Sequence, residues 1–452
     1  MARPLSRNLT EGNPTKQILG FFFPLLVGVL FQQAYAFIDT IIIGHGIGVL
    51  AMAGVGSTGS LNGLITGTCL GMCYGFVIPV AQCFGQSDFY NMKKYTVNAI
   101  ILSLLLSVGI SVVFSLLCKR LLIWSNTPQD ILHYANTYQL TLFIGLPIIF
   151  LYNVLLGIIR SMGDSRTPVT YMIIGAVLNI LLDLLFVLLF KWGVIGSAIA
   201  TLLAQALAML LCIRYIVKSD ILIIAKDEWR LHKDKVKVLL SLALPVGAQY
   251  FITSIGGMVI QIATNGLGST AVAAVAAASK VSQVFCAPFD ALGNTMATYA
   301  GQHVGAGILH RIRKGIRSCM TIGTIYSIVV FIFLYFFREP LLTIFVNREE
   351  VEVLALAKNW LFYNVLFYMF ITIVNCFRFT IQGMGFAKQT MISGIIEMIA
   401  RFITGLLLVK KIGFLAISIA NPVAWVCASI FLIFGYLHYM KILEKKKEMG
   451  AL

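Results

Sequence analysis

Charged residues are scarce in this 452-residue sequence. Asp, Glu, Lys and Arg make up only 12% of it, and 59% of the residues are hydrophobic, whereas a soluble domain carries roughly 25% charged and about 45–50% apolar residues. The mean hydropathy is +0.90. A soluble fold of this composition would have to expose a large apolar surface to water. The composition therefore excludes a soluble globular protein.

Three motifs of nucleotide binding and catalysis are also missing from the sequence. It contains no GxxxxGK[ST] phosphate loop, no HExxH zinc motif and no GxSxG nucleophile elbow. Direct use of ATP is therefore not expected, and ion-coupled transport is the default interpretation. A membrane-embedded enzyme is an alternative that would need a carboxylate beside His45 or His303. We interpret both histidines as residues at span ends and predict no enzyme.

What the sequence does contain is long apolar runs, and these cover most of the chain. A helix needs roughly 20 residues to cross the hydrocarbon core, and unbroken runs of that length exclude the strands of a membrane barrel. We predict an all-α polytopic membrane protein with twelve transmembrane helices. The expected spans are 17–43, 54–84, 96–118, 134–159, 169–190, 193–217, 238–265, 274–304, 317–337, 354–382, 390–409 and 413–437.

The formal net charge of +16 is distributed unevenly along the chain. Most Lys and Arg residues fall in segments that an even number of spans places on the same side as both termini. This pattern is the positive-inside bias of membrane proteins, and attraction to anionic lipid accounts for the charge. We expect both termini to be cytoplasmic, and we expect no nucleic-acid partner.

An internal repeat of about 220 residues organises the chain. Residues 46–55 align with 266–275, residues 82–85 with 302–305, and Pro24 with Pro245, at a constant offset of 220 to 222. Six helices per repeat bring each half back to its starting side, so the halves form a parallel repeat. This arrangement predicts a cleft between two lobes and alternating access. The predicted segments are a first lobe at 1–217, a basic cytoplasmic linker at 218–237, a second lobe at 238–437 and a basic cytoplasmic tail at 438–452.

Two carboxylates of the first half lie in predicted spans without a basic residue at the same depth. They are Asp39 and Asp183, and each costs at least roughly 2.5–3.5 kcal/mol on insertion scales. Asn179 lies one turn before Asp183, and Thr201 lies in the next span. Two such carboxylates would share a proton or be bridged by a cation, and oxygen donors suit a proton or an alkali ion. The alternative is that each Asp bonds only a helix hydroxyl or backbone group.

The second half of the chain carries a different set of charges. Glu397 and Arg401 are spaced i, i+4, which predicts a local ion pair. By the repeat, Arg401 replaces Asn179 and Gly405 replaces Asp183, so this half has lost the second carboxylate. Asp290 and Lys280 form either another pair or part of a substrate site. The candidate substrate-cleft residues are Gln33, Asp290, Lys280 and Gln249.

Four motifs carry a resemblance to a known family. They are Phe37-Ile-Asp39-Thr-Ile-Ile-Ile-Gly44, Ala81-Gln82-Cys-Phe-Gly85, Lys280-Val-Ser, and Gly301-Gln302-His-Val-Gly305-Ala306. Together with the twelve spans and the repeat, they resemble the multidrug and toxic compound extrusion (MATE) family over essentially the whole chain. The segment Pro288-Phe-Asp290-Ala-Leu-Gly-Asn294 is similar to that of exporters from Gram-positive anaerobes.

The resemblance implies antiport of organic cations against protons or sodium. In the DinF-like branch of the family, the first-lobe cation site matches Asp39, Asn179, Asp183 and Thr201 here, and Tyr138 is similar to a nearby tyrosine on the fourth span. The NorM-like branch has a Glu on the seventh span, where this sequence has only Gln249 and Gln261 as polar candidates. A cation site of that kind in the second lobe is therefore not expected.

These observations define the expected function. We predict a secondary active multidrug efflux antiporter in the bacterial cytoplasmic membrane that works as a monomer in the lipid bilayer. It would export small organic cations in exchange for H⁺ or Na⁺ and need no other cofactor or metal, with Pro24 as a hinge in the first span. The alternative is a flippase or exporter of a lipid-linked or specific metabolite. Relatives of that kind add spans and line their cavity with several arginines, which this chain lacks.

Overall fold

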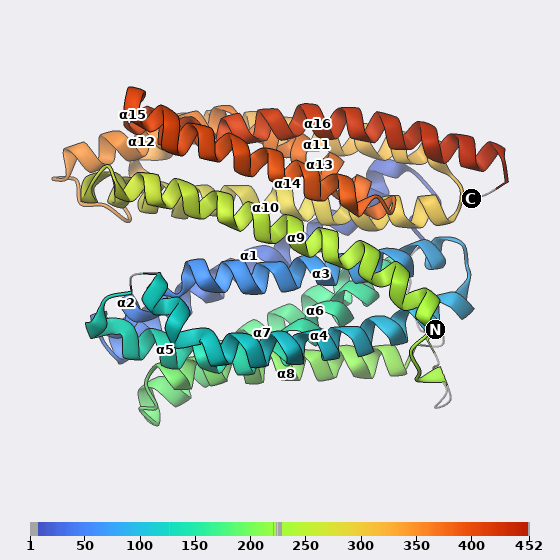
Figure 1. Ribbon diagram of the computed structural model, residues 1–452, viewed down its shortest axis with the longest axis horizontal. Coiled ribbons are helices and arrows are strands. Elements are labelled where there is room, and N and C mark those ends of the chain that lie inside the picture. The colour runs from blue at the N-terminus through green and yellow to red at the C-terminus, as the bar shows by residue number, and fades with distance from the viewer. Residues whose placement is uncertain (1–7, 126, 220, 223, 225–227, 451–452) are drawn as a thin grey trace. The chain divides into compact units, whose positions relative to one another are not determined.

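The computed structural model describes residues 8–125, 127–219, 221–222, 224 and 228–450. Long helices dominate the described residues (Figure 1). Parts of the predicted linker and tail, namely 220, 223, 225–227 and 451–452, lie outside this description.

The first half of the chain contains α1 (Pro14–Gly46), α2 (Val49–Ser57), α3 (Gly59–Gly85), α4 (Phe89–Trp124), α5 (Gln129–Ile144), α6 (Leu146–Ser161), α7 (Arg166–Asp183), the π-helix η1 (Leu184–Leu189) and α8 (Val194–Val217). The second half contains α9 (Lys233–Asn265), α10 (Ser269–Gly305), α11 (Leu309–Leu342), α12 (Val351–Leu366), α13 (Tyr368–Gly383), α14 (Ala387–Phe402), the π-helix η3 (Ile403–Leu408), α15 (Val409–Ile412) and α16 (Phe414–Glu448).

The membrane-spanning helices agree with the predicted fold class. Within the described residues, ten helices are long and apolar enough to cross a membrane. Two further pairs pass the same test together: α5 with α6, bent by 52°, and α12 with α13, bent by 49°. Counting each bent pair as one span gives the twelve predicted spans. The sequence pattern did not predict the two bends, which fall in the fourth and tenth spans.

The chain forms two compact units, and two helices contribute to both. The first unit contains Phe23–Gly247, and the second contains Leu9–Phe22 and Ala248–Leu452. Helix α1 changes unit one residue before Pro24, and α9 changes unit two residues after Pro245. Proline lacks the N–H that would bond the carbonyl four residues earlier, so it weakens the helix at these positions.

The internal repeat is visible in the backbone as well as in the sequence. The bend between α5 and α6 has its counterpart between α12 and α13, and η1 has its counterpart in η3. Gly193 precedes α8 at φ 66°, and Gly413 precedes α16 at φ 56°. Residues with a side chain rarely adopt this left-handed conformation, so both repeats require glycine at the same point.

Within the first unit, the segment before α9 is attached to α4. The Asn98 side chain is completely buried; its Nδ2 donates to the Lys94 and Arg230 carbonyls, and its Oδ1 accepts from the His232 backbone N–H at 2.8 Å. Helix α4 itself begins at the N-cap Asp88, which accepts from the Asn91 backbone and side chain. These two bonds lower the pKa of the Asp88 carboxyl.

Candidate functional site

The two carboxylates singled out in the first half lie together in the first unit. Asp183 is the last residue of α7 and is fully buried, whereas Asp39 on α1 is half-buried. Their carboxyl groups interact electrostatically with one another. Neither Asp183 oxygen accepts a hydrogen bond from a donor among the described residues. Two such carboxylates are stable at this depth only when a proton or a cation lies between them.

Neutral oxygen groups from α7 and α8 surround the pair. Asn179, one turn before Asp183, donates from Nδ2 to the Thr201 hydroxyl at 3.3 Å, and its own Oδ1 has no donor among the described residues. Ser197 on α8 is fully buried and donates from its hydroxyl to Asp39 Oδ1 at 2.6 Å. The structure thus gathers the four predicted residues Asp39, Asn179, Asp183 and Thr201.

Ser197 was missed by the sequence analysis. It lies one turn before Thr201, so the two hydroxyls share one face of α8. The spacing of Ser197 and Thr201 could have indicated a shared site. A serine in a membrane helix, however, usually bonds its own backbone, so its presence alone does not predict a functional role.

Two tyrosines complete the polar surroundings of the acidic pair. The hydroxyl of Tyr138 on α5 interacts electrostatically with both Asp39 and Asp183. Tyr35, one turn before Asp39 on α1, also interacts with both carboxylates. Tyr138 is therefore near the site, as the resemblance implied, and Tyr35 is an addition that the structure supplies.

The backbone changes helical type at the acidic pair. Asp183 ends the α-helical part of its span, and the π-helix η1 starts at the next residue. A π-helix has a wider turn than an α-helix and often occurs at functional sites. In the second unit, η3 starts two residues after Arg401.

The other candidates on α1 are not part of this cluster of hydrogen bonds. Gln33 is half-buried two turns before Asp39. Pro24 lies inside the continuous helix α1, next to the point where this helix changes unit. Its predicted role as a hinge stays a prediction.

The predicted polar residues of the second unit separate into two places. Asp290 on α10 is exposed, and its Oδ1 accepts from the Asn375 side chain at 3.2 Å. Lys280 is an exposed residue ten positions earlier on α10. Gln249 is buried on α9, where it accepts from Gln382 at 3.3 Å. The hydrogen bonds among the described residues thus link Gln249 with α13 but do not join it to Asp290.

A buried ion-pair cluster lies in the second unit. Glu397 on α14 bonds Arg401 one turn later at 3.3 Å, as the i, i+4 spacing predicts, and also bonds Arg378 on α13. Arg401 Nε donates in addition to Asn421 Oδ1 at 3.2 Å on α16. The i, i+4 spacing predicts the local pair but not the contact with Arg378, because this partner comes from a different helix.

The two histidines considered for catalysis make ordinary bonds. The ring of His45 bonds the Ile41 carbonyl at 3.1 Å, and the buried ring of His303 bonds the Tyr299 carbonyl at 2.7 Å. Arg311 donates to the other ring nitrogen of His303. These contacts agree with the interpretation of both as structural residues at span ends. No cluster of three or more His, Cys, Asp or Glu occurs within the part of the chain that the structure describes.

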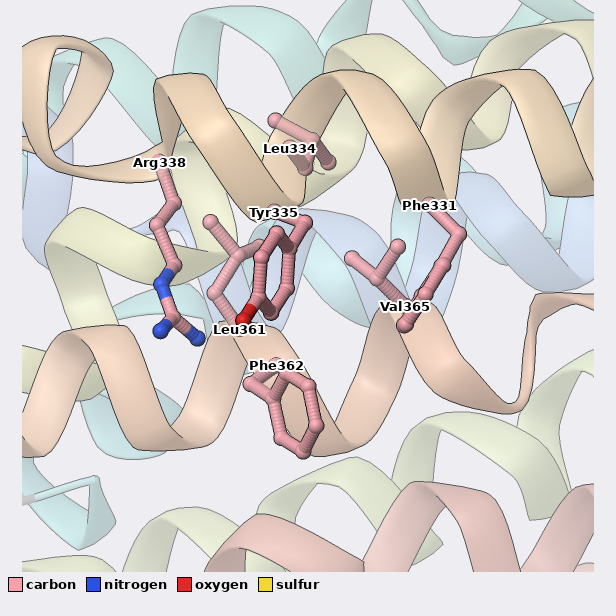
Figure 2. A pocket seen from close by; sticks show the side chains of 7 residues that line it. All are labelled: Phe331, Leu334, Tyr335, Arg338, Leu361, Phe362 and Val365. Atoms are coloured by element: carbon pink, nitrogen blue, oxygen red, sulfur yellow. The ribbon is translucent and has the colours of Figure 1, made fainter.

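Two cavities lie away from the acidic pair. One has a volume of about 300 Å³ in the first unit and is lined by apolar residues of α4, α6, α8 and the segment after α8, among them Leu155, Ile213 and Trp229. The other, between α11 and α12 in the second unit, has about 10 Å³, the lower limit for one water molecule. Figure 2 shows its aromatic wall, where the Arg338 guanidinium lies 5.6 Å from the Tyr335 ring and 5.4 Å from the Phe362 ring.

Comparisons with known proteins find a matching family model and the same fold. The family model described as MatE matches the chain twice, over residues 24–185 and 245–407. The probable multidrug resistance protein YpnP of Bacillus subtilis (strain 168) is 25% identical over 393 residues, 86% of this chain and 87% of the relative. The probable multidrug resistance protein YoeA of the same strain is 26% identical over 445 residues, 96% of this chain and 94% of the relative. The crystal structure of MATE in complex with MaL6 has a TM-score of 0.90 at 21% identity, covering 98% of this chain and 100% of that chain, and so shares the fold.

Proposed function

Because this chain belongs to the MatE family of membrane transporters and not to a family of enzymes, we propose that it is a secondary active multidrug antiporter. It exports organic, mostly cationic amphiphilic compounds in exchange for protons or sodium by alternating access. The observation that carries this proposal is the fully buried Asp183, whose oxygens have no donor among the described residues and whose carboxyl interacts electrostatically with that of Asp39. Two such carboxylates need a proton or a cation between them. The names of two relatives, which are probable multidrug resistance proteins, support drug-like compounds as the exported class.

The acidic pair supplies the coupling in this proposal. A proton, or a sodium ion with the Asn179 and Thr201 oxygens as further ligands, stabilises the first-unit conformation in which the two carboxylates meet. A ligand shifts a conformational equilibrium only by its different affinity for the two states. The cationic compound binds the other state, so drug and coupling ion exclude each other. In this proposal the site is of the DinF-like type, and Pro24 is the hinge of α1.

Imposed gradients test the proposal and identify the ion. Purified protein in liposomes is loaded with a fluorescent organic cation, and an inward gradient of either H⁺ or Na⁺ is applied. We expect one of the two gradients to drive loss of the dye from the liposomes, and a mock gradient of K⁺ to drive none. Dye movement that is the same with all three gradients would contradict antiport.

The orientation of the chain gives a second prediction. We propose that both termini are cytoplasmic and that the protein is a monomer in the bacterial cytoplasmic membrane. A cysteine at exposed Trp229 in the linker or at Lys445 in the tail should react with a membrane-impermeant maleimide only after the cells are opened. The native cysteines are buried or half-buried, and the unmodified chain measures their background. Labelling of Trp229→Cys in sealed cells would reverse the orientation.

A further inference from the structure

None of the described residues that line the larger cavity of the first unit is charged. The cavity has a volume of about 300 Å³ and is lined by Ile100, Leu151, Leu155, Ile213, Ile216, Val217, Leu222, Ile224 and Trp229. An apolar cavity of about 150 Å³ can stay free of water and bind benzene, because a buried water molecule needs polar partners. The cavity of the first unit is therefore suited to an apolar group and not to water.

The cavity lies close to one edge of the hydrocarbon core. Ile100, Leu155 and Ile213 line it from α4, α6 and α8, and each lies about one helical turn inside the end of its expected span. All three positions are on the side of the linker, because residues of the linker line the same cavity. The cavity is therefore at a depth that the acyl chains of membrane lipids reach.

The linker forms the remaining wall of the cavity. Leu222 is buried, and its backbone N–H donates to the Ser219 carbonyl, so the chain turns directly after α8. Trp229 is 50% exposed, and the carbonyl of the next residue, Arg230, accepts from the buried Asn98 side chain of α4. The linker is thus attached to α4 beside a cavity that its own side chains do not fill.

Basic residues flank the lining residues at this end of the unit. Residues 214–237 contain seven Lys or Arg and four Asp or Glu. Arg214, Lys218 and Arg230 are exposed, and each directly follows a lining residue in the sequence. None of the three forms a salt bridge with another described residue. Basic pockets between membrane helices bind the anionic head groups of lipids.

We propose that this cavity binds one acyl chain of an anionic membrane phospholipid, whose phosphate is held by Arg214, Lys218 and Arg230. The bilayer supplies such chains at the depth of the cavity, and a chain that fills the void gives its lining atoms the van der Waals contacts that they lack. An organic cation fits this place poorly, because the same basic residues repel it. The bound lipid joins the linker to α4, α6 and α8, a role separate from the transport of compounds.

Quenching of Trp229 fluorescence tests the proposal, because this side chain lines the cavity and bromine on an acyl chain quenches tryptophan only at short range. The full-length protein is placed in phosphatidylcholine vesicles that contain a minor fraction of phosphatidylglycerol. In one sample the phosphatidylglycerol is brominated, and in the other an equal amount of the phosphatidylcholine. The emission of Trp229 is the difference between the unmodified protein and Trp229→Phe. We expect stronger quenching by brominated phosphatidylglycerol, since each basic side chain should raise the affinity for the anionic lipid about 5-fold.

Cavity-filling variants locate the acyl chain. Ile213→Phe places a larger side chain in the cavity and should remove the quenching by brominated phosphatidylglycerol. Val217→Phe, at an exposed position of the lining, makes the same test if Ile213→Phe does not fold. Leu210→Phe is the matched control, because Leu210 is an exposed residue of α8 that is not part of the lining. This control should keep the quenching.

Charge variants test the head-group site. Arg214→Gln combined with Lys218→Gln should make quenching by the two brominated lipids nearly equal. Lys119→Gln combined with Arg120→Gln removes two exposed basic residues near the other end of α4 and should keep the preference. The proposal is overturned if both lipids quench the unmodified protein equally, if a folded cavity-filling variant is quenched as before, or if the variant of Arg214 and Lys218 keeps the preference. Because no ion gradient is used, these outcomes are independent of whether antiport itself is demonstrated.

Discussion

Replacement of either Asp39 or Asp183 by Asn is expected to abolish gradient-driven export while the protein remains folded. The two carboxyl groups interact electrostatically, and neither Asp183 oxygen has a donor among the described residues. An Asn at either position supplies an N–H to the remaining carboxylate. The coupling ion then has no role in joining α1 to α7, and its gradient no longer favours one conformation.

The double variant distinguishes a shared site from two separate ones. If Asp39 and Asp183 act through one ion, the protein with both substitutions should be no worse than either single variant, because effects within one unit do not add. Export is measured in liposomes with matched protein content, and folding is checked by size-exclusion chromatography. Full ion-coupled export by either single variant would remove the acidic pair from the mechanism.

Ser197→Ala provides a graded control for the same site. The serine hydroxyl donates to Asp39 Oδ1 at 2.6 Å but cannot replace the ion between the carboxylates. Its removal should weaken the apparent affinity for the coupling ion and leave the maximal export rate near that of the unmodified protein. Thr40→Ala is a suitable comparison, since this exposed hydroxyl bonds the carbonyl of Ala36 on its own helix.

The spans were predictable from the sequence because the bilayer imposes a simple rule. Every backbone group in hydrocarbon must be bonded within its own helix. An apolar run of sufficient length therefore predicts a membrane-spanning helix. The bends at Gly145 and Phe367 carry no comparable signal. A Cβ at Gly145 would collide with Leu202 on α8, so this glycine reflects a tertiary contact that the local sequence does not contain.

The acidic pair was predictable for a related reason. A carboxylate in a span is conspicuous because it is costly there, and Asn179 is visible one turn before Asp183. Ser197 and Tyr35 are not conspicuous, since hydroxyl groups occur throughout membrane helices. Their roles depend on which side chain lies opposite them, and only the packing of α1 against neighbouring helices determines that.

The ion-pair cluster of the second unit shows where local spacing fails. The i, i+4 spacing of Glu397 and Arg401 suggested a complete pair, and the structure contains it. Arg378 comes from α13, on the other side of the break between α13 and α14, and bonds the same carboxylate. Because two arginines share one glutamate, the cluster is not a neutral ion pair but carries an excess of positive charge.

Glu397→Gln is therefore expected to lower the stability of the protein by about 3–5 kcal/mol, the cost of leaving a buried charge without its partner. The substitution leaves both Arg378 and Arg401 with positive charge at a buried position and no carboxylate between them. Arg401→Gln should be much milder, because Arg378 still pairs with Glu397. In a simple ion pair, the loss of either partner would lower the stability by a similar amount. Here the loss of Glu397 should lower it much more than the loss of Arg401.

Thermal unfolding of the purified protein, followed by size-exclusion chromatography after heating, measures this difference. The melting temperature should fall strongly for Glu397→Gln and slightly for Arg401→Gln, and the triple change of Glu397, Arg378 and Arg401 to Gln, Met and Met should recover part of the loss. At matched protein content, Glu397→Gln should still couple export to the ion gradient, since Asp39 and Asp183 belong to the other unit. A Glu397→Gln protein of normal stability that exports without ion coupling would instead place Glu397 in the coupling mechanism.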